Sequence, residues 1–254
     1  MRKKKIIFGI FVTFCGVLAL WLFLDHFFSF EYQEWVFKKY PDMTIFYGVN
    51  ILSRYADFSF FTYITTIIFG IWCILFGISN CFDQNKFNNF LKKSTVVSFV
   101  FTNYLITTVG YTLFELTVAN DKFGLYANTA KAWHNFGTNL FVHYILFVFA
   151  TIVFVFIKAP KSNTKKARYF YLSFLLLYVA IVKVTGEFAY SIRWFPYIIF
   201  DATSFGNALG ISSYPLCVLL TILTFTILAL AYTLLFTIFA HLKEKQNFAL
   251  CQAQ

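Results

Sequence analysis

Two side chains that could take part in proton transfer lie inside apolar stretches of this sequence. His143 is in NLFVHYILFVFA, and Thr62 lies about one turn inside the first end of ADFSFFTYITTIIFGIWCILFGIS. A single histidine is sufficient for a general base, and a threonine hydroxyl can serve as a nucleophile once a base takes its proton. We predict that Thr62 meets His143 and that the rest of the chain forms a cage around the pair.

Other roles for His143 need partners that the sequence does not supply. Haem iron would need a second axial ligand at matching depth, and zinc would need three or four clustered ligands. His26 and His134 lie in segments predicted outside, and His241 lies at the inner interface. We therefore predict no metal and no cofactor. The structural alternatives stay open: a buried histidine is often a packed, hydrogen-bonded residue, and Thr62 could bond to the carbonyl one turn earlier.

Five further polar residues are candidates for substrate binding. Lys183 and Glu187 have the i, i+4 spacing of helical neighbours, so they form either a structural ion pair or, with Arg193, a site for a substrate carboxylate. Asn103 and Asn139 fit either hydrogen bonds between helices or oxyanion donors. Polar groups inside a bilayer are costly, so each needs a partner or a function.

The composition indicates an integral membrane protein. Of 254 residues, 59% are hydrophobic and only 13% are charged, whereas soluble domains carry about 25% charged residues. Apolar runs of about 18 residues or more recur along the chain, as bilayer-spanning helices require. We predict an all-α, polytopic bundle of six transmembrane helices in a single domain, residues 1–254. The six helices are predicted at residues 6–24, 57–79, 94–115, 139–157, 169–188 and 214–240.

The distribution of charge predicts the orientation. Fourteen of the 21 Lys and Arg residues fall in segments that are inside if the N-terminus is inside, and six fall in the outer segments. This asymmetry predicts a multi-pass protein of the cell membrane with both termini in the cytoplasm. Of the acidic residues, only Asp83 and Glu244 fall inside. We attribute the net charge of +10 to topology and predict no nucleic-acid partner.

The predicted topology places several polar residues at a common depth. Thr62 is the fifth or sixth residue of a helix that enters from outside, and His143 is the fifth residue of another. At about 1.5 Å per residue, both lie about 7 Å below the outer boundary. Lys183 and Glu187 lie near the outer end of their helix. The predicted site is therefore in the outer half of the bilayer.

These motifs resemble those of a membrane hydrolase superfamily. Phe61-Thr62 near the outer start of the second helix, the Asn139–His143 spacing in the fourth, and six helices with both termini inside are similar to the androgen-induced membrane hydrolases, the androgen-dependent TFPI-regulating protein and their bacterial relatives. The resemblance implies an intramembrane hydrolase of lipid-like esters, with Thr62 as nucleophile, His143 as base and a lipid or fatty-acyl substrate. Thr65-Thr66 and Tyr144-Ile145 depart from the Asn and Pro common in the bacterial relatives.

Two other functions fit the sequence. One is a membrane-embedded substrate-binding or transport protein, in which Lys183, Glu187 and Arg193 bind a small anionic solute from outside. The other is a purely structural membrane protein, although that role leaves the outer polar residues without a purpose. Nothing in the sequence sets an oligomeric state.

Overall fold

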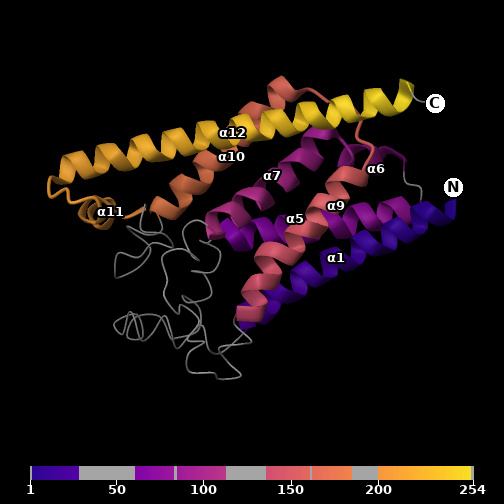
Figure 1. The fold of residues 1–254 in the computed structure, drawn as a ribbon, viewed down its shortest axis with the longest axis horizontal. Helices are drawn as coiled ribbons and strands as arrows, with labels where there is room; N and C mark the ends of the chain where they lie inside the picture. The colour runs from indigo at the N-terminus through magenta and orange to yellow at the C-terminus, as the bar shows by residue number, and fades with distance from the viewer. Residues whose placement is uncertain are drawn as a thin grey trace. The chain divides into compact units, whose positions relative to one another are not determined.

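The computed structural model describes residues 2–28, 61–82, 85–112, 136–160, 162–184 and 200–252. Every element that these residues form is helical. In chain order the elements are α1 (Arg2–Phe28), α5 (Phe61–Cys81), α6 (Asn85–Leu91), α7 (Ser94–Gly110), the π-helical turn η3 (Phe141–Ile145), α9 (Leu146–Phe156), α10 (Thr164–Val184), α11 (Ala202–Ala208) and α12 (Tyr214–Gln252) (Figure 1). The all-α prediction is confirmed for this part of the chain.

Five of the helices are long and apolar enough to cross a membrane, which is consistent with an integral membrane protein. They are Lys3–Asp25, Phe61–Cys81, Phe136–Phe156, Thr164–Val184 and Tyr214–Gln246. The third predicted span corresponds to α7, which is apolar but has only 17 residues. The count of six transmembrane helices and the cytoplasmic location of both termini stay predictions.

Large apolar side chains are exposed along the spans, as contact with lipid requires. On α1 they recur every three or four residues and form one continuous stripe: Ile7, Ile10, Phe14, Val17, Trp21 and Leu24. The opposite face of α1 is buried, with Val12, Cys15 and Ala19 all at 0% exposure. An exposed apolar stripe of this length is a liability in water and is favourable in hydrocarbon.

Several helices extend beyond the limits predicted for them. The first spans Arg2–Phe28 instead of residues 6–24, and the fourth span begins at Phe136 instead of residue 139. The fifth helix begins at Thr164 instead of residue 169, and the sixth continues to Gln252 instead of ending at residue 240. The added segments TKKAR and HLKEKQNFALCQ contain no Gly or Pro and are rich in residues that favour helices. Apolarity set the predicted limits, whereas backbone preference carries the helices further. Residues 57–60, 113–115 and 185–188 of the predicted spans lie outside the described residues.

The chain divides into two compact units. The first unit comprises Met1–Asp25, Ile64–Thr164 and Ile238–Gln254, and the second comprises His26–Tyr63 and Lys165–Thr237. The prediction of a single membrane domain over residues 1–254 stays a prediction.

Glycines bring α1 and α5 into close contact in the first unit. A Cβ atom on Gly77 would lie 2.5 Å from Gly9 O and 2.2 Å from Thr13 Oγ1, and one on Gly16 would lie 2.6 Å from Gly70 O. Each helix contributes two glycines seven residues apart, so the same face meets the partner helix after two turns. Small residues of this kind allow membrane helices to approach closely and gain van der Waals contact.

Aromatic side chains fill the core of the first unit between α7 and α9. The ring of Phe101 stacks on Phe154 with centroids 4.3 Å apart and meets Phe239 edge-on at 5.0 Å. Phe69 of α5 contacts Tyr104 at 4.9 Å between ring centroids. These contacts fix α7 against the helical segment that carries His143.

Candidate functional site

His143 lies on a π-helical turn, and this turn changes the hydrogen bonding of the backbone around it. The amide of Leu146 donates to Phe141 O, five residues back, instead of to Val142 O, four residues back. Val142 O therefore loses its usual helical donor. The Tyr104 hydroxyl of α7 supplies a replacement, donating to Val142 O over 2.9 Å. Single π-helical turns within α-helices are frequent at functional sites.

A second hydroxyl of α7 holds the backbone of the histidine itself. Thr108 Oγ1 donates to His143 O over 2.7 Å and also lies 3.1 Å from Tyr104 O, one turn earlier in its own helix. Thr108 and His143 are both buried, at 7% and 4% exposure. Because unpaired polar atoms are expensive in a buried site, these bonds specify how η3 packs on α7.

The imidazole of His143 lies face to face with the ring of Tyr111. The ring centroids are 3.7 Å apart and the planes differ by 7°. Tyr111 in turn meets the edge of Tyr144, with 6.3 Å between centroids, and the Tyr144 hydroxyl is 2.9 Å from Thr112 Oγ1. We call these four residues, Tyr111, Thr112, His143 and Tyr144, the imidazole cluster. Only His143 was identified from the sequence.

The two predicted asparagines of the site both belong to the first unit. Asn103 is buried, and its Nδ2 donates to Phe99 O, one turn earlier in α7, over 2.9 Å. This is the local bond to the helix backbone that polar residues in membrane helices commonly use. Asn139 is partly buried and lies one turn before His143 on the Phe136–Phe156 span.

Thr62 and Lys183 belong to the second unit, where one aromatic cluster connects their surroundings. Phe61, the neighbour of Thr62, packs on Tyr178 at 5.1 Å between ring centroids, and Tyr178 meets Phe200 at 6.1 Å. Lys183 Nζ donates to Phe200 O over 2.9 Å. Thr62 itself is partly buried at the start of α5. Glu187 and Arg193, with the predicted Lys183–Glu187 ion pair, lie outside the described residues.

The predicted pairing of Thr62 with His143 involves residues from different units and stays a prediction. Of the neighbouring threonines of α5, Thr65 forms a hydrogen bond between helices, which is a structural role. Thr65 and Thr66 are both buried, and Thr65 Oγ1 lies 2.8 Å from Thr107 Oγ1 of α7. A hydrogen bond between hydroxyls of two apolar helices ties α5 to α7.

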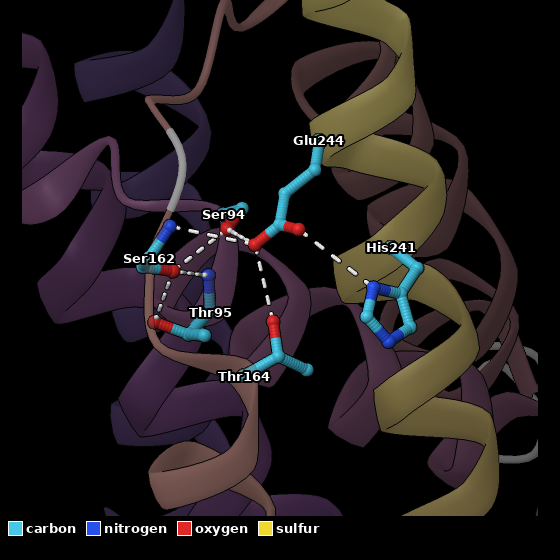
Figure 2. A network of polar contacts seen from close by, with 6 residues as sticks. All are labelled: Ser94, Thr95, Ser162, Thr164, His241 and Glu244. Carbon is cyan, nitrogen blue, oxygen red and sulfur yellow. Dashed lines mark hydrogen bonds and ion pairs between the residues drawn. The ribbon is translucent and has the colours of Figure 1, made fainter.

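Sequence reasoning missed a network of polar contacts centred on Glu244 of α12 (Figure 2). Glu244 Oε1 accepts hydrogen bonds from Ser94 Oγ and Thr164 Oγ1, both at 3.1 Å, and from Ser162 N at 3.4 Å. Its other oxygen lies 3.7 Å from His241 Nδ1. Ser94 and Thr164 are the first residues of α7 and α10. The carboxylate therefore lies where two helices present their positive ends.

Ser162 completes this network from the segment between α9 and α10. Its Oγ accepts from the amide of Thr95 at 3.1 Å and lies 2.7 Å from Ser94 Oγ. The Thr95 amide is in the first turn of α7, where no helical carbonyl is available to it. Because Ser94 is 68 residues from Ser162 and 150 residues from Glu244, no local pattern predicts these contacts. The only sequence signal is that Glu244 is one of two acids on the predicted inner side.

Lys243, the residue before Glu244, binds the negative, C-terminal end of α9. It is completely buried, and its Nζ donates to Phe154 O, to Val155 O at 3.3 Å and to Gln246 Oε1 at 2.7 Å. Gln246 Nε2 also donates to Val155 O, at 2.9 Å. Since α9 ends at Phe156, these are carbonyls left without donors at its negative end. The charge of Lys243 is matched to that end.

The first unit thus holds two polar centres at opposite ends of α9. The imidazole cluster, at the start, contains a histidine capable of acid–base chemistry. At the end, Lys243 donates to the last carbonyls of α9, and Glu244 accepts from hydroxyls and from the amide of Ser162. Within the described ranges, no group of three or more His, Cys, Asp or Glu residues could hold a metal ion. The chain matches no protein-family model, no curated protein and no solved structure.

Proposed function

We propose that this integral membrane protein hydrolyses lipid-like esters in the outer half of the bilayer, with Thr62 as the nucleophile and His143 as the general base. We also propose that it belongs with the androgen-induced and androgen-dependent TFPI-regulating protein-like membrane hydrolases that its motifs resemble. Its substrate would be a lipid or fatty-acyl ester, since an acyl chain can pack against the exposed apolar side chains of the spans.

The observation that supports the proposal is the setting of His143. The imidazole is buried on a π-helical turn, in a helix apolar enough to cross a membrane, and stacks on Tyr111. The Tyr104 and Thr108 hydroxyls donate to the carbonyls of Val142 and His143 and hold the turn that carries the imidazole. Ionisable residues within membrane spans are rare and generally functional. A general base is the role that a single histidine can fill.

The reaction proceeds through an acyl-enzyme. Thr62 Oγ1 attacks the ester carbonyl carbon while its proton passes to His143. The bond to the alcohol oxygen breaks, and the imidazolium returns the proton to that oxygen. Water then attacks the acyl carbon, with His143 again taking a proton, and the fatty acid leaves as the Thr62 hydroxyl re-forms.

Substrate binding is assigned to the remaining polar residues. Asn139, one turn from His143, is the proposed donor to the carbonyl oxygen that becomes negative in the tetrahedral intermediate. Asn103 has the same proposed role, for which Nδ2 would have to leave Phe99 O. Lys183, Glu187 and Arg193 are proposed to hold the polar end of the substrate.

The test uses the full chain purified in detergent, with a medium-chain p-nitrophenyl ester and a fluorophosphonate probe. Thr62→Ala and His143→Gln should each lower turnover by about 10²–10⁴-fold and lose probe labelling. Thr151→Ala is the matched threonine control, because Thr151 only bonds back to Phe147 O in its own helix. Full turnover and labelling in both site variants would refute the dyad. If a small anionic solute then stabilised the protein against heat, the binding or transport function would replace it.

A further inference from the structure

The imidazole cluster contains a residue whose geometry has consequences for the base. Tyr111 is at the end of α7, 7% exposed, and its ring covers one face of the His143 imidazole at 3.7 Å between centroids. A gap of this size leaves no room for another atom between the rings. The Tyr111 ring therefore prevents the imidazole from tilting toward it and favours a parallel orientation of the two rings.

Tyr111 is itself held in place by its neighbours. The ring of Tyr144 packs against it in a T-shaped arrangement, with 6.3 Å between centroids and 75° between the planes, and the hydroxyl of Tyr144 is 2.9 Å from Thr112 Oγ1. Thr112 follows Tyr111 in the chain and also bonds back to Thr108 O at 2.8 Å. Thr112 therefore links the ring of Tyr144 to the backbone of α7, and this link helps to hold Tyr111 in place.

A parallel ring also affects how stable a positive charge is on the neighbouring ring. The face of an aromatic ring carries negative potential and attracts a cation placed over it. A general base must be neutral before the reaction, and the imidazole becomes an imidazolium when it takes the hydroxyl proton. The interaction with Tyr111 is therefore stronger in the charged intermediate than in the resting enzyme, and interactions of that kind increase turnover instead of only tightening binding.

We infer that Tyr111 is a positioning residue for His143, acting through the stacked ring and not through its hydroxyl. This inference rests on the proposed role of His143 as general base. Tyr111→Leu should reduce kcat by about 10–100-fold, the range expected when a catalytic group is displaced by about 1 Å, and should leave KM unchanged. Tyr111→Phe keeps the ring face and should turn over like the parent protein.

The stack has a spectroscopic signature that does not depend on activity. With histidine labelled at Cε1 in the full chain, His143→Gln identifies the His143 resonance among the four histidines. A ring whose centroid is 3.7 Å away should shift the attached proton to lower frequency in the parent protein and in Tyr111→Phe. Tyr111→Leu should lose that shift. Retention of the other three histidine resonances shows that the variant has folded.

The outcomes separate the two proposals. If the shift is lost in Tyr111→Leu while kcat is unchanged, the stack exists but Tyr111 does not position the base, and the inference is wrong. The absence of a ring-current shift in the parent protein would also overturn it. If His143→Gln instead keeps full turnover, the hydrolase proposal itself fails, whatever the resonances of the Tyr111 variants show.

Discussion

Replacing Glu244 tests whether the hydrogen bonds that its carboxylate accepts stabilise the folded state of the first unit. Glu244→Ala removes the oxygen that accepts from Ser94 Oγ, Thr164 Oγ1 and Ser162 N. Ser94 is 0% exposed and Thr164 8% exposed, so water cannot easily replace the lost acceptor. Glu244→Gln keeps an acceptor oxygen of the same shape but removes the negative charge.

The magnitudes follow from the number and kind of these contacts. A hydrogen bond to a charged group contributes about 1.5–3 kcal/mol, but three bonds to one oxygen are not additive, so Glu244→Ala should cost roughly 3–4 kcal/mol. The charge itself interacts with the positive ends of α7 and α10 at about 0.3–1 kcal/mol each. Glu244→Gln should therefore cost only roughly 1–2 kcal/mol.

Thermal unfolding of the purified chain in detergent measures the effect. At about 2–4 °C per kcal/mol for a chain of this size, Glu244→Ala should lower the midpoint by roughly 6–16 °C and Glu244→Gln by about half of that or less. Lys245→Ala is the matched control, since Lys245 is the exposed neighbour in the same helix. The argument from buried donors and helix ends is wrong if Glu244→Ala has the same unfolding midpoint as the control. It is also wrong if Glu244→Gln lowers the midpoint as much as Glu244→Ala does.

Three further predictions concern the first unit, each read from the same unfolding midpoint. Lys243→Met should cost roughly 2–3 kcal/mol because Phe154 O and Val155 O lose a charged donor, and a midpoint like that of the parent would contradict this. Gly77→Ala should destabilise strongly, since its Cβ would lie 2.5 Å from Gly9 O. Gly110→Ala, with no atom within 4 Å of its Cβ, should be neutral or stabilising by up to about 1 kcal/mol; equal midpoints for the two glycine variants would contradict the close approach of α1 and α5. Tyr104→Phe removes the donor to Val142 O and should cost about 1–3 kcal/mol; an unchanged midpoint would mean that the π-helical turn does not need it.

Much of the fold could be predicted because it depends on local composition. Runs of apolar residues locate the spans, since hydrocarbon forces each span to satisfy its own backbone. The ends of helices were less predictable: α12 continues to Gln252 because a polar sequence can be as helical as an apolar one.

The length of α12 shows what this extension makes possible. The helix has 39 residues. At about 1.5 Å of rise per residue, a helix of that length extends roughly 58 Å. A hydrocarbon core is only about 30 Å thick. The last turns of α12 therefore need not lie in hydrocarbon and are free to bind the ends of other helices, as Lys243 and Glu244 do.

The candidate site was predictable only in its chemistry. A histidine within an apolar run is visible in any sequence, so His143 could be identified by type and depth. The π-helical turn could not, because one extra residue per turn leaves no mark in FVHYI itself. Tyr111 was equally hidden, since a tyrosine near the end of an apolar helix is common and only the fold shows that its ring covers the imidazole.

The polar groups of the first unit differ in what their surroundings explain. Lys243 donates to carbonyls at the end of α9, and Glu244 accepts from Ser94 Oγ at the start of α7, so both charges have polar partners within the first unit. The π-helical turn likewise frees a carbonyl, but Tyr104 serves it, and His143 projects an ionisable ring onto Tyr111. Backbone requirements therefore account for Lys243 at the end of α9 and for the hydroxyls of Tyr104 and Thr108 at its start.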